Sequence, residues 1–135
     1  MTEPPQKLRT PVLETARLHL RPMRYEDSRA TQEKFPHWEV VKYLNAKIPW
    51  PYPEGEAGRH LAEFIPKMEA GELSGWAICL RNEPDELIGR IDLRPYKQGE
   101  EMRGFWLAQE YWSRGLMTEA ANRVTDFAFR DLGFA

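Results

Sequence analysis

The sequence lacks several features that would narrow its interpretation at once. Cys79 is the one cysteine among 135 residues, so no internal disulfide can form, and its apolar surroundings predict a buried, unreactive side chain. No segment approaches the roughly 20 consecutive apolar residues of a membrane-spanning helix, and the polar first residues are unlike a signal peptide. The formal net charge of -2 gives no indication of nucleic-acid binding. We therefore expect a cytoplasmic protein without membrane or nucleic-acid partners.

Common signatures of metal and nucleotide sites are absent as well. The three histidines (His19, His37 and His60) are too scattered for metal-ligand spacing, so we expect no metal. Neither a Gly-x-x-x-x-Gly-Lys loop nor the three-glycine dinucleotide fingerprint occurs. A phosphate-bearing ligand would therefore need another kind of loop.

The length and the hydropathy pattern predict a single domain over residues 1–135. Three prolines within residues 1–11 favour a loose leader. Apolar runs predict strands over 17–23, 76–80, 87–93 and 102–108, and helical spacing predicts helices over 25–35, 38–44, 54–70 and 118–132. This order indicates an α/β (α+β) fold with a mixed, mostly antiparallel sheet flanked by helices.

The segment Tyr111–Ala120 (YWSRGLMTEA) is the most informative part of the chain. It follows a strand-like run and opens a helix-like one through a turn that contains Gly115. Such a turn leaves backbone N–H groups unpaired at the positive end of a helix dipole, which suits it to phosphate. Glu119 is expected to complement that dipole. The alternative is a plain strand-to-helix turn in which Gly115 serves only the backbone geometry.

Four segments together resemble the GNAT N-acetyltransferases, and within them the RimJ/RimL-type branch. They are Leu13–Pro22, Ile88–Ile91, Arg103–Leu107 and Tyr111–Ala120, in the order that this family has. The resemblance implies a GNAT-like acyl-CoA N-acyltransferase fold. Family members continue beyond the helix that follows Gly115, so we expect the C-terminal strands of the fold to be missing, with the fold truncated after the acetyl-CoA-binding helix.

The resemblance implies transfer of an acetyl group from acetyl-CoA to a primary amine, either a protein N-terminus or a small molecule, by direct attack. In the family's loop pattern Gly115 matches strictly, whereas Trp112 and Met117 depart from it, and the bulk of Met117 narrows the approach to the pyrophosphate. The residues implied in cofactor binding are Trp106, Leu107 and Ala108 along the pantetheine arm, and Trp112, Arg114, Gly115, Leu116, Met117 and Thr118 in the loop.

The catalytic assignments are less specific. The backbone N–H of Leu107 is expected to polarise the thioester carbonyl. The general base could be Glu101, Glu100, Asp92 or an ordered water, and the alternative for the two glutamates is an exposed turn. Trp38, Trp50 and Tyr52 occupy the region where this family's acceptor groove is walled, or they serve packing alone.

The absence of the C-terminal strands would affect the oligomeric state of the protein. It would leave an exposed sheet edge, so we expect a homo-oligomer that pairs through that edge. The sequence could also be an incomplete record of a longer protein. A further alternative is a catalytically inactive GNAT fragment that acts as a CoA-binding or protein-interaction module.

Overall fold

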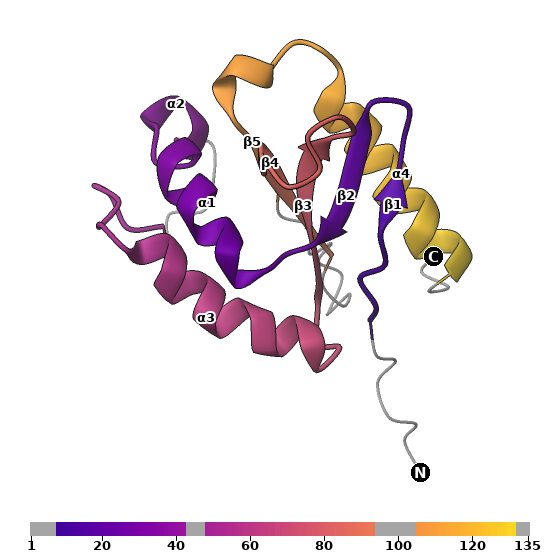
Figure 1. Ribbon diagram of the computed structural model, residues 1–135, viewed down its shortest axis with the longest axis horizontal. Helices are drawn as coiled ribbons and strands as arrows, with labels where there is room; N and C mark the ends of the chain where they lie inside the picture. Colours follow the sequence, from indigo (N-terminus) through magenta and orange to yellow (C-terminus); the bar gives the residue numbers. More distant parts are fainter. Residues whose placement is uncertain (1–7, 43–47, 94–104, 132–135) are drawn as a thin grey trace.

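The computed structural model describes residues 8–42, 48–93 and 105–131. Within them one sheet is flanked by helices (Figure 1). The strands are β1 (Leu13–Glu14), β2 (Leu18–Pro22), β3 (Ser74–Leu80), β4 (Gly89–Leu93) and β5 (Phe105–Leu107). The helices are η1 (Tyr25–Asp27), α1 (Ser28–Lys34), α2 (Trp38–Val41), α3 (Glu56–Glu69), η2 (Gln109–Tyr111) and α4 (Leu116–Asp131), where η1 and η2 are short 3-10 helices. In this part of the chain no helix is both long and apolar enough to cross a bilayer.

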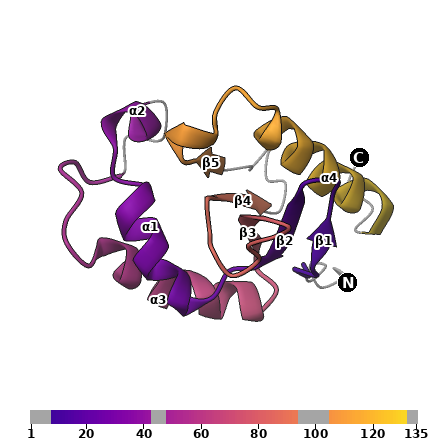
Figure 2. The same cartoon turned by 45° about the horizontal axis from the view of Figure 1, so that its top comes forward.

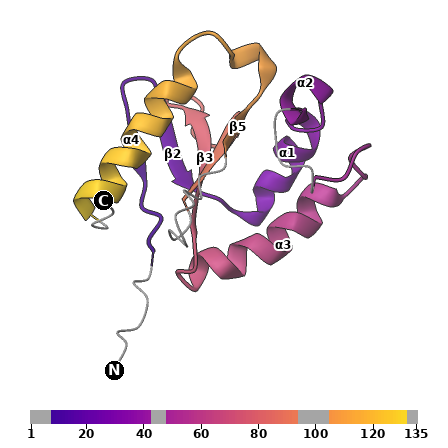
Figure 3. The same ribbon diagram turned by 180° about the vertical axis from the view of Figure 1, so that it is seen from behind.

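The sheet has the order β1-β2-β3-β4-β5, and each pair of neighbours is antiparallel. Helix α4 covers one face, and α1, α2 and α3 lie on the other side (Figures 2 and 3). The predicted α/β (α+β) fold, a sheet flanked by helices, is confirmed. The sheet expected to be mixed is antiparallel at all of its described pairings.

Two hydrophobic clusters fill the space on either side of the sheet. Alternate residues of β3 point to opposite faces. Trp76 and Ile78 belong to the α4 side, where the Trp76 ring meets Phe127 edge-on at 5.7 Å between centroids. Ala77 and Cys79 belong to the side of α1–α3. The continuous apolar run of β3 is therefore explained by burial on both faces.

Several element ends differ from the expectation. The helix expected from 118 begins at Leu116, directly after Gly115, whose positive φ of 74° is not helical. The helix expected over 25–35 is divided into η1 and α1. The strand expected over 102–108 and the helix expected over 38–44 extend into segments outside the described residues, and their described parts are β5 and α2.

Residues 8–11 are attached to the sheet, contrary to the expected loose leader. Leu8 is buried, and its N–H donates to the carbonyl of Gly71 at 2.9 Å. The indole of Trp76 donates to the carbonyl of Pro11 at 2.7 Å. These bonds satisfy buried polar groups beside β3, so the prediction is wrong for residues 8–11, whereas residues 1–7 lie outside the described part.

A single first strand was expected over residues 17–23, but the structure has a hairpin of β1 and β2 in this region. Leu13 of β1 pairs with Leu20 of β2. Thr15 closes the turn, because its N–H donates to the Leu18 carbonyl and its hydroxyl accepts from the Leu18 N–H, each at 3.0 Å. A strand of two residues is too short for alternation to reveal it.

The burial of Cys79 predicts a slow reaction with thiol reagents. Its side chain is 0% exposed, and burial raises its pKa to about 11. At a pH of about 8, about one thiol in a thousand would be a thiolate even if a reagent could reach it. Iodoacetamide followed by intact mass should show almost no labelling of the native protein and complete labelling in urea. Rapid native labelling would contradict this packing.

Candidate active site

A cleft of about 390 Å³ lies between the outer edge of β5 and the start of α4. Its floor is apolar, and none of the described side chains that line it is acidic. The lining residues are Val40, Phe105, Trp106, Leu107, Tyr111, Trp112, Ser113, Gly115, Leu116, Met117 and Thr118. An apolar groove without carboxylates is suited to a ligand that carries negative charge at one end.

The register of β5 determines which backbone groups face the cleft. The Ala108 N–H donates to the Ile88 carbonyl at 2.9 Å, so this pair is of the hydrogen-bonded kind. In an antiparallel pair the next residue along turns both of its backbone groups away from the neighbouring strand. Leu107, which lies opposite Gly89, therefore directs its N–H and C=O toward the outer edge of the described sheet.

Trp112 uses one of these two groups. Its indole Nε1–H donates to the Leu107 carbonyl at 2.7 Å and holds the loop against the strand. The Leu107 N–H is thus the group left to face a ligand. A preorganised backbone donor at the bottom of an apolar cleft is a means of stabilising negative charge on an oxygen.

The loop between η2 and α4 has an unusual backbone. Ser113 and Gly115 both have positive φ, 64° and 74° respectively. Helix α4 begins immediately afterwards, and the Glu119 N–H makes its first-turn bond to the Gly115 carbonyl at 3.0 Å. The N–H groups of the preceding residues have no partner within the helix, and the helix dipole is positive at this end. Such a loop can bind phosphate.

The cleft brings together all but two of the residues that the resemblance assigned to acetyl-CoA. Ala108 is buried, and its N–H donates to the carbonyl of Ile88, the residue just before β4. Arg114 is exposed and holds its guanidinium carbon 5.6 Å from the centroid of the Tyr111 ring.

Four lining residues carried no assignment from the sequence. Phe105, Tyr111 and Ser113 belong to the segments that carried the resemblance, and their neighbours in the sequence could have indicated them. Val40 comes from α2, which only the tertiary structure brings to the cleft.

Of the three carboxylates considered as general bases, Asp92 is the one within the described part of the chain. Glu101, like Glu100, lies outside the described residues. Asp92 is buried on β4 and accepts two hydrogen bonds from Arg90, at 2.8 and 3.1 Å. Arg90 also contacts His60 Nε2 at 2.8 Å. Asp92 is not among the residues that line the cleft.

The three aromatic residues expected at the acceptor groove are not among the residues that line the cleft. Trp38 and Trp50 are exposed, and their rings are 5.4 Å apart between centroids. Tyr52 packs edge-on against Phe35 at 5.3 Å, and Phe35 packs against Trp106 at 5.1 Å. These contacts link Tyr52 to Trp106 of β5, whereas Trp38 and Trp50 form a separate pair.

In the described ranges, no group of three or more His, Cys, Asp or Glu side chains is arranged to hold a metal ion.

Glu119, which was expected to complement the helix dipole, is hydrogen-bonded to Thr15 and Arg17 of the β1–β2 turn.

Comparisons with known proteins agree with this fold. The uncharacterized N-acetyltransferase p20 of Bacillus licheniformis is 28% identical over 123 residues, which cover 89% of this chain and 67% of that protein. The crystal structure of an acetyltransferase from Agrobacterium tumefaciens matches with a TM-score of 0.70 at 24% identity, covering 98% of this chain and 75% of the other. RimL, a ribosomal alpha-N-protein acetyltransferase in complex with coenzyme A, matches with a TM-score of 0.69 at 16% identity, covering 89% and 69%.

The sequence model of the acetyltransferase (GNAT) domain matches residues 17–135. This range begins just before β2 and includes every helix of the described structure. The chain therefore belongs to the GNAT family of acetyltransferase enzymes.

Proposed function

We propose that this chain transfers an acetyl group from acetyl-CoA to a primary amine by direct attack of the amine on the thioester. The observation that carries the proposal is the cleft itself. It runs from a backbone N–H on the outer edge of β5 to the N-terminus of α4, and most of the side chains that line it are apolar. GNAT acetyltransferases use acetyl-CoA, and the similar RimL structure contains coenzyme A.

The residues divide between the two ends of the cosubstrate. Trp106 and Leu107 lie on the strand where a pantetheine arm would run, and Ala108 follows directly after it. Backbone N–H groups around Arg114 and Gly115, and those of Leu116, Met117 and Thr118 at the start of α4, suit the pyrophosphate. Trp112 supports both parts, because its indole joins the loop to the Leu107 carbonyl.

The chemical step needs a donor to the thioester oxygen and a proton acceptor for the amine. We assign the donor to the Leu107 N–H, where charge develops during attack. For the acceptor we retain Glu101 and an ordered water, and we rank Asp92 below them because Arg90 occupies its carboxylate. An amine is mostly protonated at neutral pH, so removal of a proton must precede attack.

The amine would approach from the α1–α3 side, where Trp38, Trp50 and Tyr52 provide aromatic surface. Such surface suits an acceptor with an apolar body, such as a protein N-terminus or a hydrophobic small amine.

Assembly through the sheet edge stays a prediction. The edge of β5 is also the wall of the cleft, so a second copy and a pantetheine arm would compete for the Leu107 N–H. Sedimentation with and without CoA tests this. A monomer under both conditions would contradict the oligomer.

Titration calorimetry with acetyl-CoA, followed by a screen of amine acceptors, tests the proposed function. Binding at micromolar concentration together with acetylation of any amine would support it. Binding without turnover would favour a non-catalytic CoA-binding or interaction module. A folded protein that does not bind acetyl-CoA would contradict both.

Reversing the charge of Arg114 should weaken CoA binding by about tenfold or more, because a carboxylate would then face phosphate across the loop. Arg130→Glu is the matched control, since Arg130 is exposed near the other end of α4 and pairs with Asp126 at 2.7 Å. Both changes alter the net charge equally. If calorimetry gave Arg114→Glu and Arg130→Glu the same affinity for CoA, the phosphates of CoA would not bind at the loop that contains Arg114.

A further inference from the structure

Arg17, in the turn between β1 and β2, contacts both the cradle loop, defined here as residues 112–115, and the first turn of α4. Its Nε donates to the Glu119 carboxylate at 2.9 Å, and its Nη1 donates to the Arg114 carbonyl at 2.8 Å. Its backbone N–H donates to the same carboxylate at 3.0 Å. One guanidinium thus links two segments whose relative position defines the proposed phosphate site.

Thr15 completes this contact. Its hydroxyl donates to the second oxygen of Glu119, so the carboxylate is bound by the side chains of two residues and by a backbone N–H. The turn lies beside the start of α4 at one end of the sheet (Figure 1). The cradle loop is therefore held from outside by a distant part of the chain, since Arg17 and Arg114 are separated by 97 positions in the sequence.

The guanidinium also lies close to the glycine of the cradle loop. A Cβ placed on Gly115 would be 3.5 Å from Arg17 Nη2. Because Gly115 lines the cleft, Arg17 lies directly behind the surface that would meet phosphate. Its side chain is half exposed, at 50%, so solvent still reaches it.

Charge gives a second reason for this arrangement. Partial burial raises the pKa of Glu119, but the hydrogen bonds from Thr15 and Arg17 outweigh it, so the pKa lies below its usual value. Glu119 is therefore an anion at neutral pH, next to the N-terminus of α4. Without a paired cation, that anion would repel phosphate and offset the helix dipole.

We infer that Arg17 is a positioning residue for the phosphates of CoA: it fixes the cradle loop through the Arg114 carbonyl and neutralises Glu119. The inference rests on the proposed function, because it assumes CoA as the ligand. It adds a residue outside the loop motif and outside the cleft lining.

The test compares CoA with pantetheine, which has the same thiol arm and no phosphate. Arg17→Ala should raise the dissociation constant for CoA by about tenfold or more, as expected from the loss of charge-assisted hydrogen bonds. It should leave the affinity for pantetheine, measured by ligand-observed NMR, unchanged. Arg17→Lys keeps the positive charge, but a single ammonium group cannot reach both Glu119 and Arg114 as the guanidinium does. The CoA affinity of Arg17→Lys should therefore lie between that of the wild type and that of Arg17→Ala.

Arg81→Ala is the matched control. Arg81 is exposed to a similar extent, 55%, and it contacts the same turn through Glu14 and the Thr15 carbonyl, at 3.1 and 3.4 Å. The substitution Arg81→Ala removes one positive charge, as Arg17→Ala does, but it removes no contact with the cradle loop. Its CoA affinity should equal that of the wild type.

Two results would overturn the inference while leaving the proposed function intact. One is an unchanged CoA affinity in both Arg17 variants. The other is an equal loss of affinity for CoA and pantetheine, which would mean that Arg17 serves the fold as a whole. If Arg17→Ala does not fold, the folded Arg17→Lys variant decides between these results. A wild-type protein that binds no CoA would instead overturn the proposed function, and the inference with it.

Discussion

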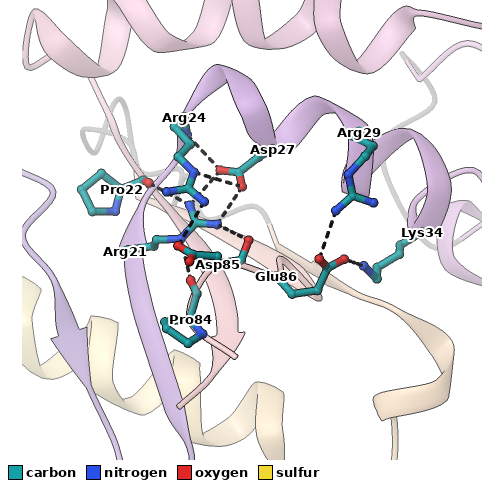
Figure 4. A network of polar contacts seen from close by, with 9 residues as sticks. All are labelled: Arg21, Pro22, Arg24, Asp27, Arg29, Lys34, Pro84, Asp85 and Glu86. Carbon is teal, nitrogen blue, oxygen red and sulfur yellow. Dashed lines mark hydrogen bonds and ion pairs between the residues drawn. The ribbon is translucent and has the colours of Figure 1, made fainter. Parts of the chain in front are cut away.

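Replacing Asp27 by alanine is expected to lower the free energy of unfolding by about 3–5 kcal/mol, because it leaves the buried charge of Arg21 without its partner. The side chains of Arg21 and Asp27 are 8% and 3% exposed, respectively. They form a bidentate pair, with hydrogen bonds of 3.0 and 2.8 Å (Figure 4). Urea unfolding followed by tryptophan fluorescence measures the change.

The size of this effect follows from what the pair connects. Arg21 of β2 also donates to the Pro84 carbonyl at 2.8 Å, and Asp27 accepts from the Arg24 N–H at 2.9 Å at the start of η1. The pair thus ties β2 to the first helix and to the turn between β3 and β4. Burial disfavours the charged Arg21, but the hydrogen bond to Asp27 and the charge interactions with its neighbours together outweigh burial, so the pKa of Arg21 is raised.

Asp85→Ala is the control for Asp27→Ala. Its carboxylate pairs with Arg24 at 3.3 Å but is 86% exposed, so its loss should change stability by less than about 1 kcal/mol. Both variants remove one carboxylate from the same network. If Asp27→Ala and Asp85→Ala lowered the free energy of unfolding by similar amounts, burial would not determine the contribution of the Arg21–Asp27 pair to stability.

Gly89→Ala is expected to separate β4 from β5 and to abolish tight binding of CoA. A Cβ at Gly89 would be 2.5 Å from the Trp106 carbonyl oxygen and 3.1 Å from Leu107 Cα. Both are backbone atoms, so no side-chain rotation relieves the clash. We expect a loss of about 1–3 kcal/mol in stability, as for other overpacked sites, and displacement of the Leu107 N–H.

Gly58→Ala in α3 is the matched change. There a Cβ meets the Tyr25 hydroxyl at 3.4 Å, an ordinary contact, and alanine in a helix interior is favoured over glycine by about 0.5–1 kcal/mol. Urea unfolding and CoA titration on both variants separate stability from binding. If Gly89→Ala bound CoA with unchanged affinity, the proposed site would not depend on the contact between β4 and β5.

The sequence predicted those parts of the fold whose signal is local. The continuous apolar run of β3 and the helical spacing of α4 each identify an element, because burial imposes a period on the residues that it contacts. The loop at Gly115 was identified for a similar reason. A turn that needs positive φ and is followed by a helix leaves a recognisable pattern within ten residues.

Contacts between distant segments could not be predicted in this way. Nothing near Glu119 indicates that its partners are Thr15 and Arg17, and as a first-turn acid it fitted the helix dipole equally well. The spacing of Arg90 and Asp92 places both on one face of a strand, but their pairing depends on rotamers and on His60. Val40 reaches the cleft only through the packing of α2.

The order of strands in the sheet has a consequence for synthesis. Because β1 to β5 are neighbours in the same order as in the chain, each strand can pair as soon as it emerges from the ribosome. Helix α4 comes later than all five, and until it docks, the Trp76 face of the sheet lacks the Phe127 contact. The nascent protein therefore passes through a stage with a broad apolar surface, which a chaperone can recognise, and the contact between Arg17 and Glu119 closes only when that stage ends.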